Sequence, residues 1–491
     1  MNEPVLSRAF INTLDKLVQL SIVLFSLYLG FETGFNKHIS GEEGVVLDCV
    51  RFEFWRLLLP KDLYVQGCTI DHMPLYHLLA KGVFTLFGYD VIPFRALSVL
   101  ISCVTGLFLY NWINRTKSIQ SVLLAAVIVY FYFSASFTIQ HFTFIRMYSL
   151  YALTALLSFI YFEKYLESKD DRSLLILCFV NFLGFANYAV HILLSISQFY
   201  YVRNVIPSDQ QKRGYKVFLY IMSLYAIIKS VPLIQWRVLE RSKDVAVRLD
   251  LQHIIEDFLL TWSGERAENA AFYIFLTILI ASITITLLNR KRTKLVNYHL
   301  CLLAGTLVLA FGLRYGLNLR EVSFRYFLYI GFIPLLLIRE LASRKAYYYL
   351  FLSLFLTVSF NRGLELKINI WKNAQLELKQ LIEFTKPITE VLNRDGFATD
   401  SFTYFNYYIK AVHDYELKRP LNEAELLFDE NFDEHEVKWY FLFHSKNIDS
   451  FVSSTKTPLK ILEKYKFSTA FDDHKYVIIL KAEPYPVGQK K

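Results

Sequence analysis

Charged residues are scarce in this chain. Asp, Glu, Lys and Arg make up 20% of its 491 residues, whereas 54% are hydrophobic and the mean hydropathy is +0.32. A soluble protein of this size carries more charge and fewer aromatic side chains. The composition therefore excludes an ordinary soluble enzyme and indicates a polytopic membrane protein. The net charge of +9 then reports membrane topology rather than nucleic-acid binding.

Cysteine, glycine and proline are also few. The five cysteines show none of the spacings typical of a metal site. Cys103, Cys178 and Cys301 lie in apolar runs and are expected to be small core residues. Cys49 and Cys68 share one loop, and they would form a disulfide if that loop faces an oxidising compartment. The sequence contains no repeat, no low-complexity tract and no heptad pattern.

Apolar runs long enough to cross a bilayer as helices recur through the first three quarters of the chain. The first ten residues lack the short apolar core and cleavage site of a signal peptide, so the first run is expected to stay as an anchor. Eleven spans are predicted, at about 17–35, 92–112, 119–138, 147–166, 173–190, 191–205, 216–234, 271–289, 296–315, 326–341 and 346–361.

The distribution of basic residues predicts which connecting loops lie on the same side of the membrane. Five basic loops fall on one side of the membrane if the N-terminus is cytoplasmic: 114–117, 163–172, 210–216, 289–294 and 338–345. Eleven spans then place the C-terminus outside. The predicted domains are 1–361, a transmembrane domain that includes an outer loop at 36–91, and 362–491, a small extracytoplasmic α/β domain. In the latter, 437–443 and 474–481 resemble strands and 458–465 a helix.

The outer loop 36–91 concentrates polar residues that are costly near a membrane. Its carboxylates include Glu42, Glu43, Asp48, Glu53, Asp62 and Asp71, and its histidines include His72 and His77. A helix is predicted to begin at Pro74, because proline is tolerated in a first turn. Asp71 is then either a helix N-cap or part of an anion-binding helix start. His77 is expected to be a packing residue.

Five motifs appear in order along one predicted topology. They are "SGEEGV" with Glu42 and Glu43, "DHMPLYHLL" with Asp71, His72 and Tyr76, "LFGYDVIPFRALSVL" with Gly88 and Arg95, "FIRMYSLYAL" with Arg146 and Tyr148, and "SFRYFLYIGFIP" with Arg325, Tyr326 and Pro334. Together they resemble the GT-C glycosyltransferases, in the branch of the protein O-mannosyltransferases and the lipid A aminoarabinose transferase. The chain departs from that pattern in its Glu-Glu pair, in Met73, and in Asn187 where the family has a His.

The resemblance implies transfer of a sugar from a polyprenyl-phosphate donor to an acceptor hydroxyl at the outer membrane face, with inversion. A carboxylate takes the acceptor proton; Glu42 is the first choice, with Glu43 or Asp71 assisting. Positive and hydroxyl side chains would hold the donor phosphate. These candidates are His72, Tyr76, Arg95, Arg146, Tyr148, Arg325 and Tyr326. Implied partners are the lipid-linked sugar, membrane lipids and a protein, lipid or glycan acceptor, but no nucleic acid.

Other interpretations stay open. Arg146 and Arg325 could each be snorkelling arginines at helix ends, and His191 could be a packed polar residue. No cofactor is implied, although the acidic loop leaves a divalent cation possible. The alternative functions are a transporter or flippase, for which related halves with broken helices are expected, and a non-catalytic scaffold, which the Glu-Glu variant favours. A composition rich in Lys, Ile, Phe and Tyr with few Gly and Pro residues favours an AT-rich bacterium, and hence its inner membrane.

Overall fold

The computed structural model describes most of the first 312 residues and short parts of the rest. The described residues are 8–35, 41–58, 74–134, 136–202, 213–225, 284, 294–312, 329, 331–333, 335–336, 339, 397–399, 438–443, 459–468 and 476–484. The chain divides into two compact units, one of Met1–Phe35, Phe52–Leu79 and Arg95–Lys367, and one of Asn36–Arg51, Ala80–Phe94 and Ile368–Lys491.

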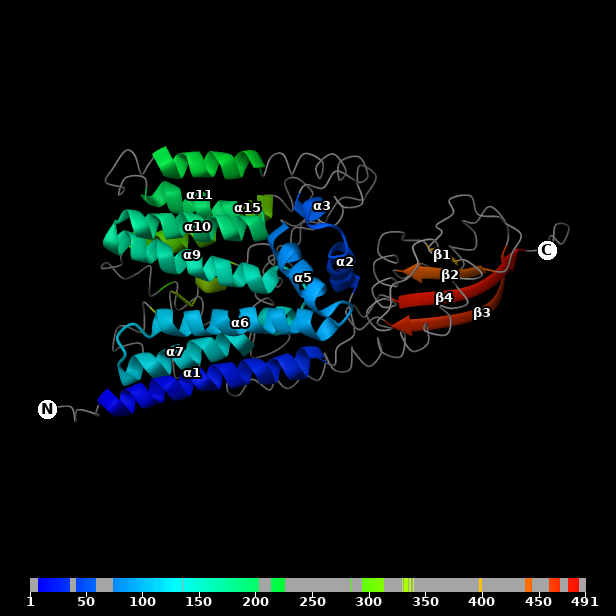
Figure 1. Cartoon of the computed structure of the whole chain (residues 1–491), viewed down its shortest axis with the longest axis horizontal. Coiled ribbons are helices and arrows are strands. Elements are labelled where there is room, and N and C mark those ends of the chain that lie inside the picture. Colours follow the sequence, from blue (N-terminus) through cyan, green and yellow to red (C-terminus); the bar gives the residue numbers. More distant parts are fainter. Residues whose placement is uncertain are drawn as a thin grey trace. The chain divides into compact units, whose positions relative to one another are not determined.

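Helices dominate the described part of the first unit (Figure 1). They occupy the predicted runs 17–35, 92–112, 119–138, 147–166, 173–190, 191–205, 216–234 and 296–315 in whole or in part. The predicted spans 271–289 and 346–361 lie outside the described residues, apart from residue 284, so the number of spans stays a prediction. Over both units, the helices and their bounds are α1 (Arg8–Gly30), the π-helix η1 (Phe31–Phe35), α2 (Gly41–Cys49), α3 (Phe54–Leu58), α5 (Pro74–Phe87), α6 (Val91–Ile113), α7 (Ile119–Ser134), α8 (Ser136–His141), α9 (Tyr148–Ser168), α10 (Asp171–Asn187), α11 (His191–Val202) and α15 (Lys294–Phe311).

Short connections make α9, α10 and α11 successive antiparallel neighbours. Lys169 ends α9 in the left-handed conformation, and Asp170 caps α10 by accepting a hydrogen bond from the Ser173 amide at 2.7 Å. Hydrogen bonds from Ser168 and Ser173 lower the pKa of this exposed Asp170 carboxyl to about 2. At the other end, only residues 188–190 separate α10 from α11, as the adjoining apolar runs predicted.

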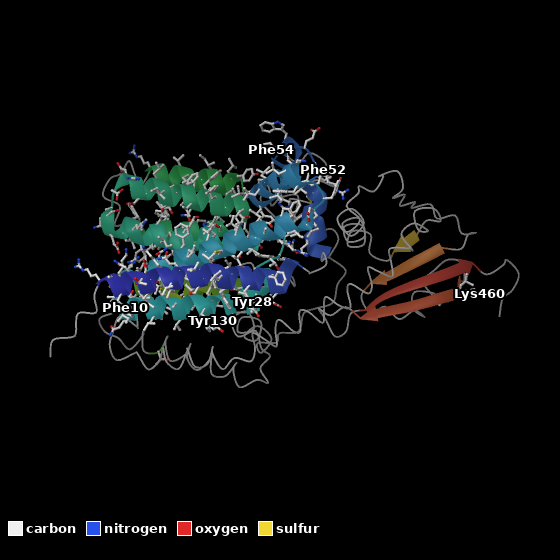
Figure 2. All side chains as sticks on the ribbon, turned by 60° about the horizontal axis from the view of Figure 1, so that its bottom comes forward. Phe10, Tyr28, Phe52, Phe54, Tyr130 and Lys460 are labelled. Atoms are coloured by element: carbon white, nitrogen blue, oxygen red, sulfur yellow. The ribbon has the colours of Figure 1, made fainter. Side chains whose placement is uncertain are left out.

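Large apolar side chains cover the outside of the helices. On α1, Leu17, Leu20, Leu24 and Leu27 form an exposed stripe at helical spacing. Figure 2 shows Phe10 on the outside in the same way. By length and composition, two of the described helices could cross a membrane, at Arg8–Gly34 and Val91–Ile113. An apolar exterior of this extent is unusual for a soluble domain and suits a hydrocarbon surrounding.

Among the buried side chains, which are mostly hydrophobic, several polar ones bond to each other between helices. Ser158 of α9 donates to Asn181 Oδ1 of α10 at 2.7 Å, and the Asn181 amide donates to Gln198 Oε1 of α11 at 2.9 Å. His191 Nε2 lies 3.0 Å from Asn181 Oδ1. His191 is fully buried, which supports its interpretation as a packed polar residue. These buried hydrogen bonds connect the successive helices α9, α10 and α11.

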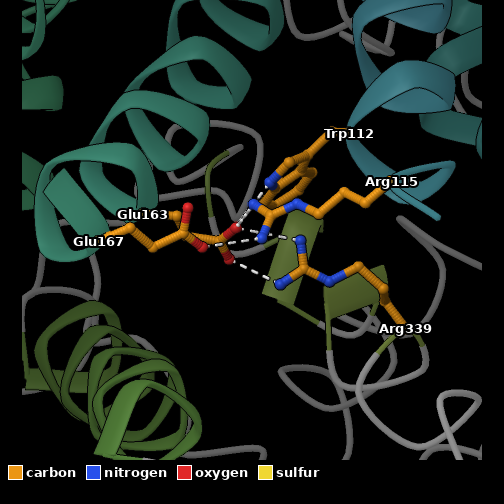
Figure 3. A network of polar contacts seen from close by, with 5 residues as sticks. All are labelled: Trp112, Arg115, Glu163, Glu167 and Arg339. Carbon is orange, nitrogen blue, oxygen red and sulfur yellow. Dashed lines mark hydrogen bonds and ion pairs between the residues drawn. The ribbon is translucent and has the colours of Figure 1, made fainter. Parts of the chain in front are cut away.

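A second polar cluster joins the ends of α6 and α9 to residue 339 (Figure 3). Glu163 accepts hydrogen bonds from Trp112 Nε1 at 2.8 Å, from both terminal nitrogens of Arg339, and from Arg115. Arg339 also stacks over the Trp112 ring, 4.6 Å from its centroid. Arg115 reaches in addition to Glu167. The expected basic loops at 114–117, 163–172 and 338–345 thus contribute residues to one cluster.

The described part of the C-terminal region is a four-stranded mixed sheet of order β1-β2-β4-β3. The strands are β1 (Phe397–Thr399), β2 (Lys438–Phe443), β3 (Leu459–Ser468) and β4 (Tyr476–Pro484). Strands were predicted at β2 and β4, but the predicted helix at 458–465 is wrong, because this segment is β3. The segment pairs antiparallel with β4 along its length, and the register shifts at a bulge between Ile461 and Glu463.

The cysteines follow the prediction in part. Cys49, at the end of α2, is disulfide-bonded, while its expected partner Cys68 lies outside the described residues. Cys103 is buried and Cys178 half-buried, as small core residues should be. The expectation is wrong for Cys301, which is exposed on α15, because apolar runs in this protein place one face outward.

Candidate functional site

The first turns of α6 carry a buried cation. Arg95 is 1% exposed, and its Nη1 donates a hydrogen bond to the carbonyl oxygen of Gly34 at 2.7 Å. Gly34 belongs to η1, which directly continues α1. Burial of a guanidinium is costly unless its donors are satisfied. Arg95 therefore joins the ends of α1 and α6.

Between α8 and α9 the chain crosses the same end of the unit in an irregular, wholly buried segment, residues 142–147. It carries Arg146, which is 9% exposed, and leads into Tyr148 at the start of α9. The Arg146 guanidinium carbon lies 5.8 Å from the centre of the Tyr148 ring, and the ring centre of His141, the last residue of α8, lies 4.3 Å from that of Tyr148. Arg146, Tyr148 and His141 thus form one group.

Three side-chain hydrogen bonds hold the segment 142–147 in place. Thr143 donates to the Thr33 carbonyl at 3.3 Å, Ser98 of α6 donates to the Phe144 carbonyl at 2.9 Å, and Asn187 of α10 donates to the Met147 carbonyl at 3.0 Å. Gly34 packs so closely on Thr143 that any β-carbon there would overlap the threonine side chain. The segment is therefore held from α1, α6 and α10.

Tyr76 connects α5 to Ser98, and through Ser98 to the segment 142–147. Its hydroxyl lies 3.1 Å from Ser98 Oγ, and the side chain is fully buried. Because Ser98 donates its single proton to the Phe144 carbonyl, which can only accept, the Tyr76 hydroxyl donates to Ser98. Hydrogen bonds to Ser98 and Gly34 thus connect four of the predicted site residues to the same part of the unit. These residues are Tyr76, Arg95, Arg146 and Tyr148.

The start of α9 favours a negative charge. Its N-cap position is occupied by Met147, which makes no capping hydrogen bond, and the first amides of a helix carry partial positive charge. Arg146 adds a full positive charge next to it. Ser149, in the first turn, is 4% exposed, and its hydroxyl has no hydrogen-bond partner among the described residues. Guanidinium, helix start and hydroxyl together are groups that bind a phosphate.

The acidic pair lies on α2, in the second unit. Glu43 is fully buried, whereas the Glu42 side chain lies outside the described residues. The disulfide of Cys49 fixes the end of this helix. In the same unit Lys81 Nζ donates to the Arg51 carbonyl at 3.4 Å, and Arg51 stacks over Tyr89. These contacts join the residues after α2 to the second half of α5.

Four predicted site residues fall outside the described residues: Asp71, His72, Arg325 and Tyr326. The helix expected to begin at Pro74 does so. Sequence reasoning missed His141, Ser98 and Thr143. The last two are small hydroxyl residues in apolar surroundings and give no signal, whereas His141, five residues before the Arg-x-Tyr motif, could have been noted as a polar residue at a predicted span end. Among the described residues, no group of three or more His, Cys, Asp or Glu side chains could hold a metal ion.

Comparison with known proteins gives matches to solved structures alone. No protein-family model and no curated protein matches the chain. The crystal structure of ArnT from Cupriavidus metallidurans bound to undecaprenyl phosphate is similar at 10% identity and a TM-score of 0.49, over 96% of this chain and 99% of that one. The apo state of the same protein matches at 10% identity and a TM-score of 0.43, over 94% and 97%.

Proposed function

We propose that the chain is an integral membrane glycosyltransferase that moves a sugar from a polyprenyl-phosphate donor to an acceptor hydroxyl. The observation that carries the proposal is the position of Arg146. This buried cation stands directly before the uncapped start of α9, beside Tyr148 and within one network with Arg95 and Tyr76. The five sequence motifs supply the reaction class, and three of them contribute residues to this network.

The chemistry requires stabilisation of a leaving phosphate. As the bond from the sugar to the lipid phosphate breaks, negative charge grows on the phosphate oxygens, and fixed donors aimed at it lower the barrier. The planar fork of Arg146 can bind two of those oxygens at once. Tyr148 and Ser149 contribute hydroxyl donors from the same helix turn. Arg325, Tyr326 and His72 are proposed to complete the phosphate site.

The other half of the reaction is proton removal from the acceptor hydroxyl. A carboxylate within hydrogen-bond reach of that hydroxyl acts as the general base while the hydroxyl attacks from the face opposite the phosphate, which inverts the anomeric carbon. Glu42 and Glu43 are the proposed bases, with Asp71 assisting. The burial of Glu43 on α2 is compatible with a carboxylate shielded from bulk water.

The proposed setting is the bacterial inner membrane. The transmembrane domain is 1–361, the extracytoplasmic domain 362–491, and the N-terminus is cytoplasmic. Single cysteines introduced at positions 114 and 440 test this topology, because a membrane-impermeant maleimide should reach 114 from the cytoplasmic side and 440 from the outside. The reverse labelling would contradict it.

Binding of undecaprenyl phosphate to the purified full-length protein tests the function. The parent is expected to bind, and Arg146→Ala is expected to weaken binding at least about tenfold, as the loss of a charge-assisted hydrogen-bond pair should. Arg172→Ala, an exposed arginine in the first turn of α10, is the control and should bind like the parent. A parent that does not bind, or equal losses in both variants, would contradict the proposal.

A further inference from the structure

The carbonyl oxygen of Phe144 accepts two hydrogen bonds that link Ser98 to Arg146. One comes from Ser98 Oγ at 2.9 Å and the other from the backbone amide of Arg146 at 2.8 Å. A carbonyl oxygen has two lone pairs, so both bonds form at once. The second bond closes a tight turn from residue 144 to residue 146, which fixes the backbone direction from which the Arg146 side chain leaves.

Ser98 is itself held on its other side. Tyr76 donates to Ser98 Oγ at 3.1 Å, so a continuous series of hydrogen bonds runs from Tyr76 through Ser98 and the Phe144 carbonyl to the Arg146 amide. Ser98 is fully buried on the same face of α6 as Arg95, one helical turn away. The series of hydrogen bonds therefore begins at Tyr76 on α5, passes through Ser98 on α6, and ends at the irregular segment that carries Arg146.

Asn187 fixes the residue on the other side of Arg146. Its Nδ2 donates to the Met147 carbonyl at 3.0 Å, and the side chain is fully buried. The backbone around Arg146 is thus fixed at residue 144 from α6 and at residue 147 from α10. Neither Ser98 nor Asn187 needs to touch a substrate to act in this way.

We propose that Ser98 and Asn187 are positioning residues that set the direction of the Arg146 side chain and thereby its affinity for a lipid phosphate. The lipid phosphate as the ligand rests on the proposed function, whereas the positioning of the Arg146 backbone by Ser98 and Asn187 does not depend on it. Loss of the Ser98 hydroxyl removes one of the two hydrogen bonds to the Phe144 carbonyl, and the tight turn that orients Arg146 then loosens. The expected consequence is weaker binding of a phosphate by an arginine that is still present.

The first experiment measures the turn itself. In hydrogen exchange of the purified full-length protein, Ser98→Ala should raise the exchange rate of the Arg146 amide, read from peptides spanning 142–148, by about three- to tenfold, the range expected for loss of one hydrogen bond. Ser98→Thr keeps the hydroxyl and should exchange like the parent. Ser102→Ala, one turn further along α6 and 5% exposed, is the matched control. Unchanged exchange in Ser98→Ala would overturn the inference.

The second experiment is a double-mutant cycle on undecaprenyl phosphate binding. Ser98→Ala and Asn187→Leu should each weaken binding about three- to tenfold in the presence of Arg146, and should have no effect in the Arg146→Ala background, because both act through that side chain. Losses that multiply in the double variants would overturn the inference. If the parent itself does not bind undecaprenyl phosphate, the proposed function fails, and the exchange experiment still decides whether Ser98 fixes the Arg146 backbone.

Discussion

Arg339 and Glu163 form a two-point ion pair. Nη2 of Arg339 lies 2.7 Å from Oε1 of Glu163, and Nη1 lies 3.1 Å from Oε2 (Figure 3). The two residues are 176 positions apart in the sequence, and the Glu163 side chain is 2% exposed. Such a parallel arrangement is the strongest geometry available to an arginine and a carboxylate, and it joins the end of α9 to a segment far along the chain.

Neutralising Glu163 should therefore destabilise the protein strongly. Glu163→Gln leaves the Arg339 charge, which is 10% exposed, without its carboxylate, and the loss of one partner of a buried pair costs about 3–5 kcal/mol. Glu167→Gln is the internal control, since Glu167 is 68% exposed and also pairs with Arg115; an exposed pair contributes about 0–1 kcal/mol. Thermal unfolding of the purified protein in detergent measures both, and similar shifts in the two variants would contradict this account.

The glycine at position 34 should be irreplaceable for a steric reason. A β-carbon there overlaps the Thr143 side chain, whereas at Gly305 of α15 it meets nothing within 4 Å. Gly34→Ala is expected to cost about 1–3 kcal/mol from overpacking and to weaken undecaprenyl phosphate binding, because it pushes the segment 142–147 that carries Arg146. Gly305→Ala should be neutral or slightly stabilising. A Gly34→Ala protein with parental stability and binding would show that the close packing is unimportant.

The disulfide of Cys49 should stabilise the part of the chain that carries the acidic pair. A native disulfide contributes about 2–5 kcal/mol, so a reductant should lower the melting temperature of the parent. Cys49→Ala and Cys68→Ala should each lower it to the same extent and make it insensitive to reductant. Cys103→Ala, a change at a free buried cysteine, should leave that sensitivity intact. A parent unaffected by reductant would exclude a stabilising role for the bond.

The interior amide network predicts a large cost for a substitution of similar size. Asn181→Leu removes the partner of Ser158, Gln198 and His191 simultaneously. Each group left buried without a partner costs about 1–3 kcal/mol, so the loss should exceed that of Asn111→Leu, whose amide bonds a carbonyl of its own helix at an exposed position. Equal melting temperatures for the two variants would contradict the proposed importance of the network.

The helices and the local motifs could be predicted from the sequence, but the contacts between residues far apart in the sequence could not. The start of α5 at Pro74 and the antiparallel pair α10–α11 follow from local signals, since proline and short connections act on neighbouring residues. The strand β3 was missed because Leu, Glu and Lys favour a helix, while the pairing of Glu463 with Lys481 that fixes it as a strand is a tertiary contact. Ser98 was missed for the same reason: its role comes from Phe144, 46 residues away.

The central claim is that Arg146 holds the phosphate of a lipid carrier, and one measurement tests it most directly. A structure of the full-length protein with bound undecaprenyl phosphate locates the phosphate group itself. The account predicts phosphate oxygens within hydrogen-bond distance of the Arg146 guanidinium, about 2.7–3.2 Å, at the start of α9. A phosphate bound elsewhere on the protein, with Arg146 not in contact with it, would contradict the account.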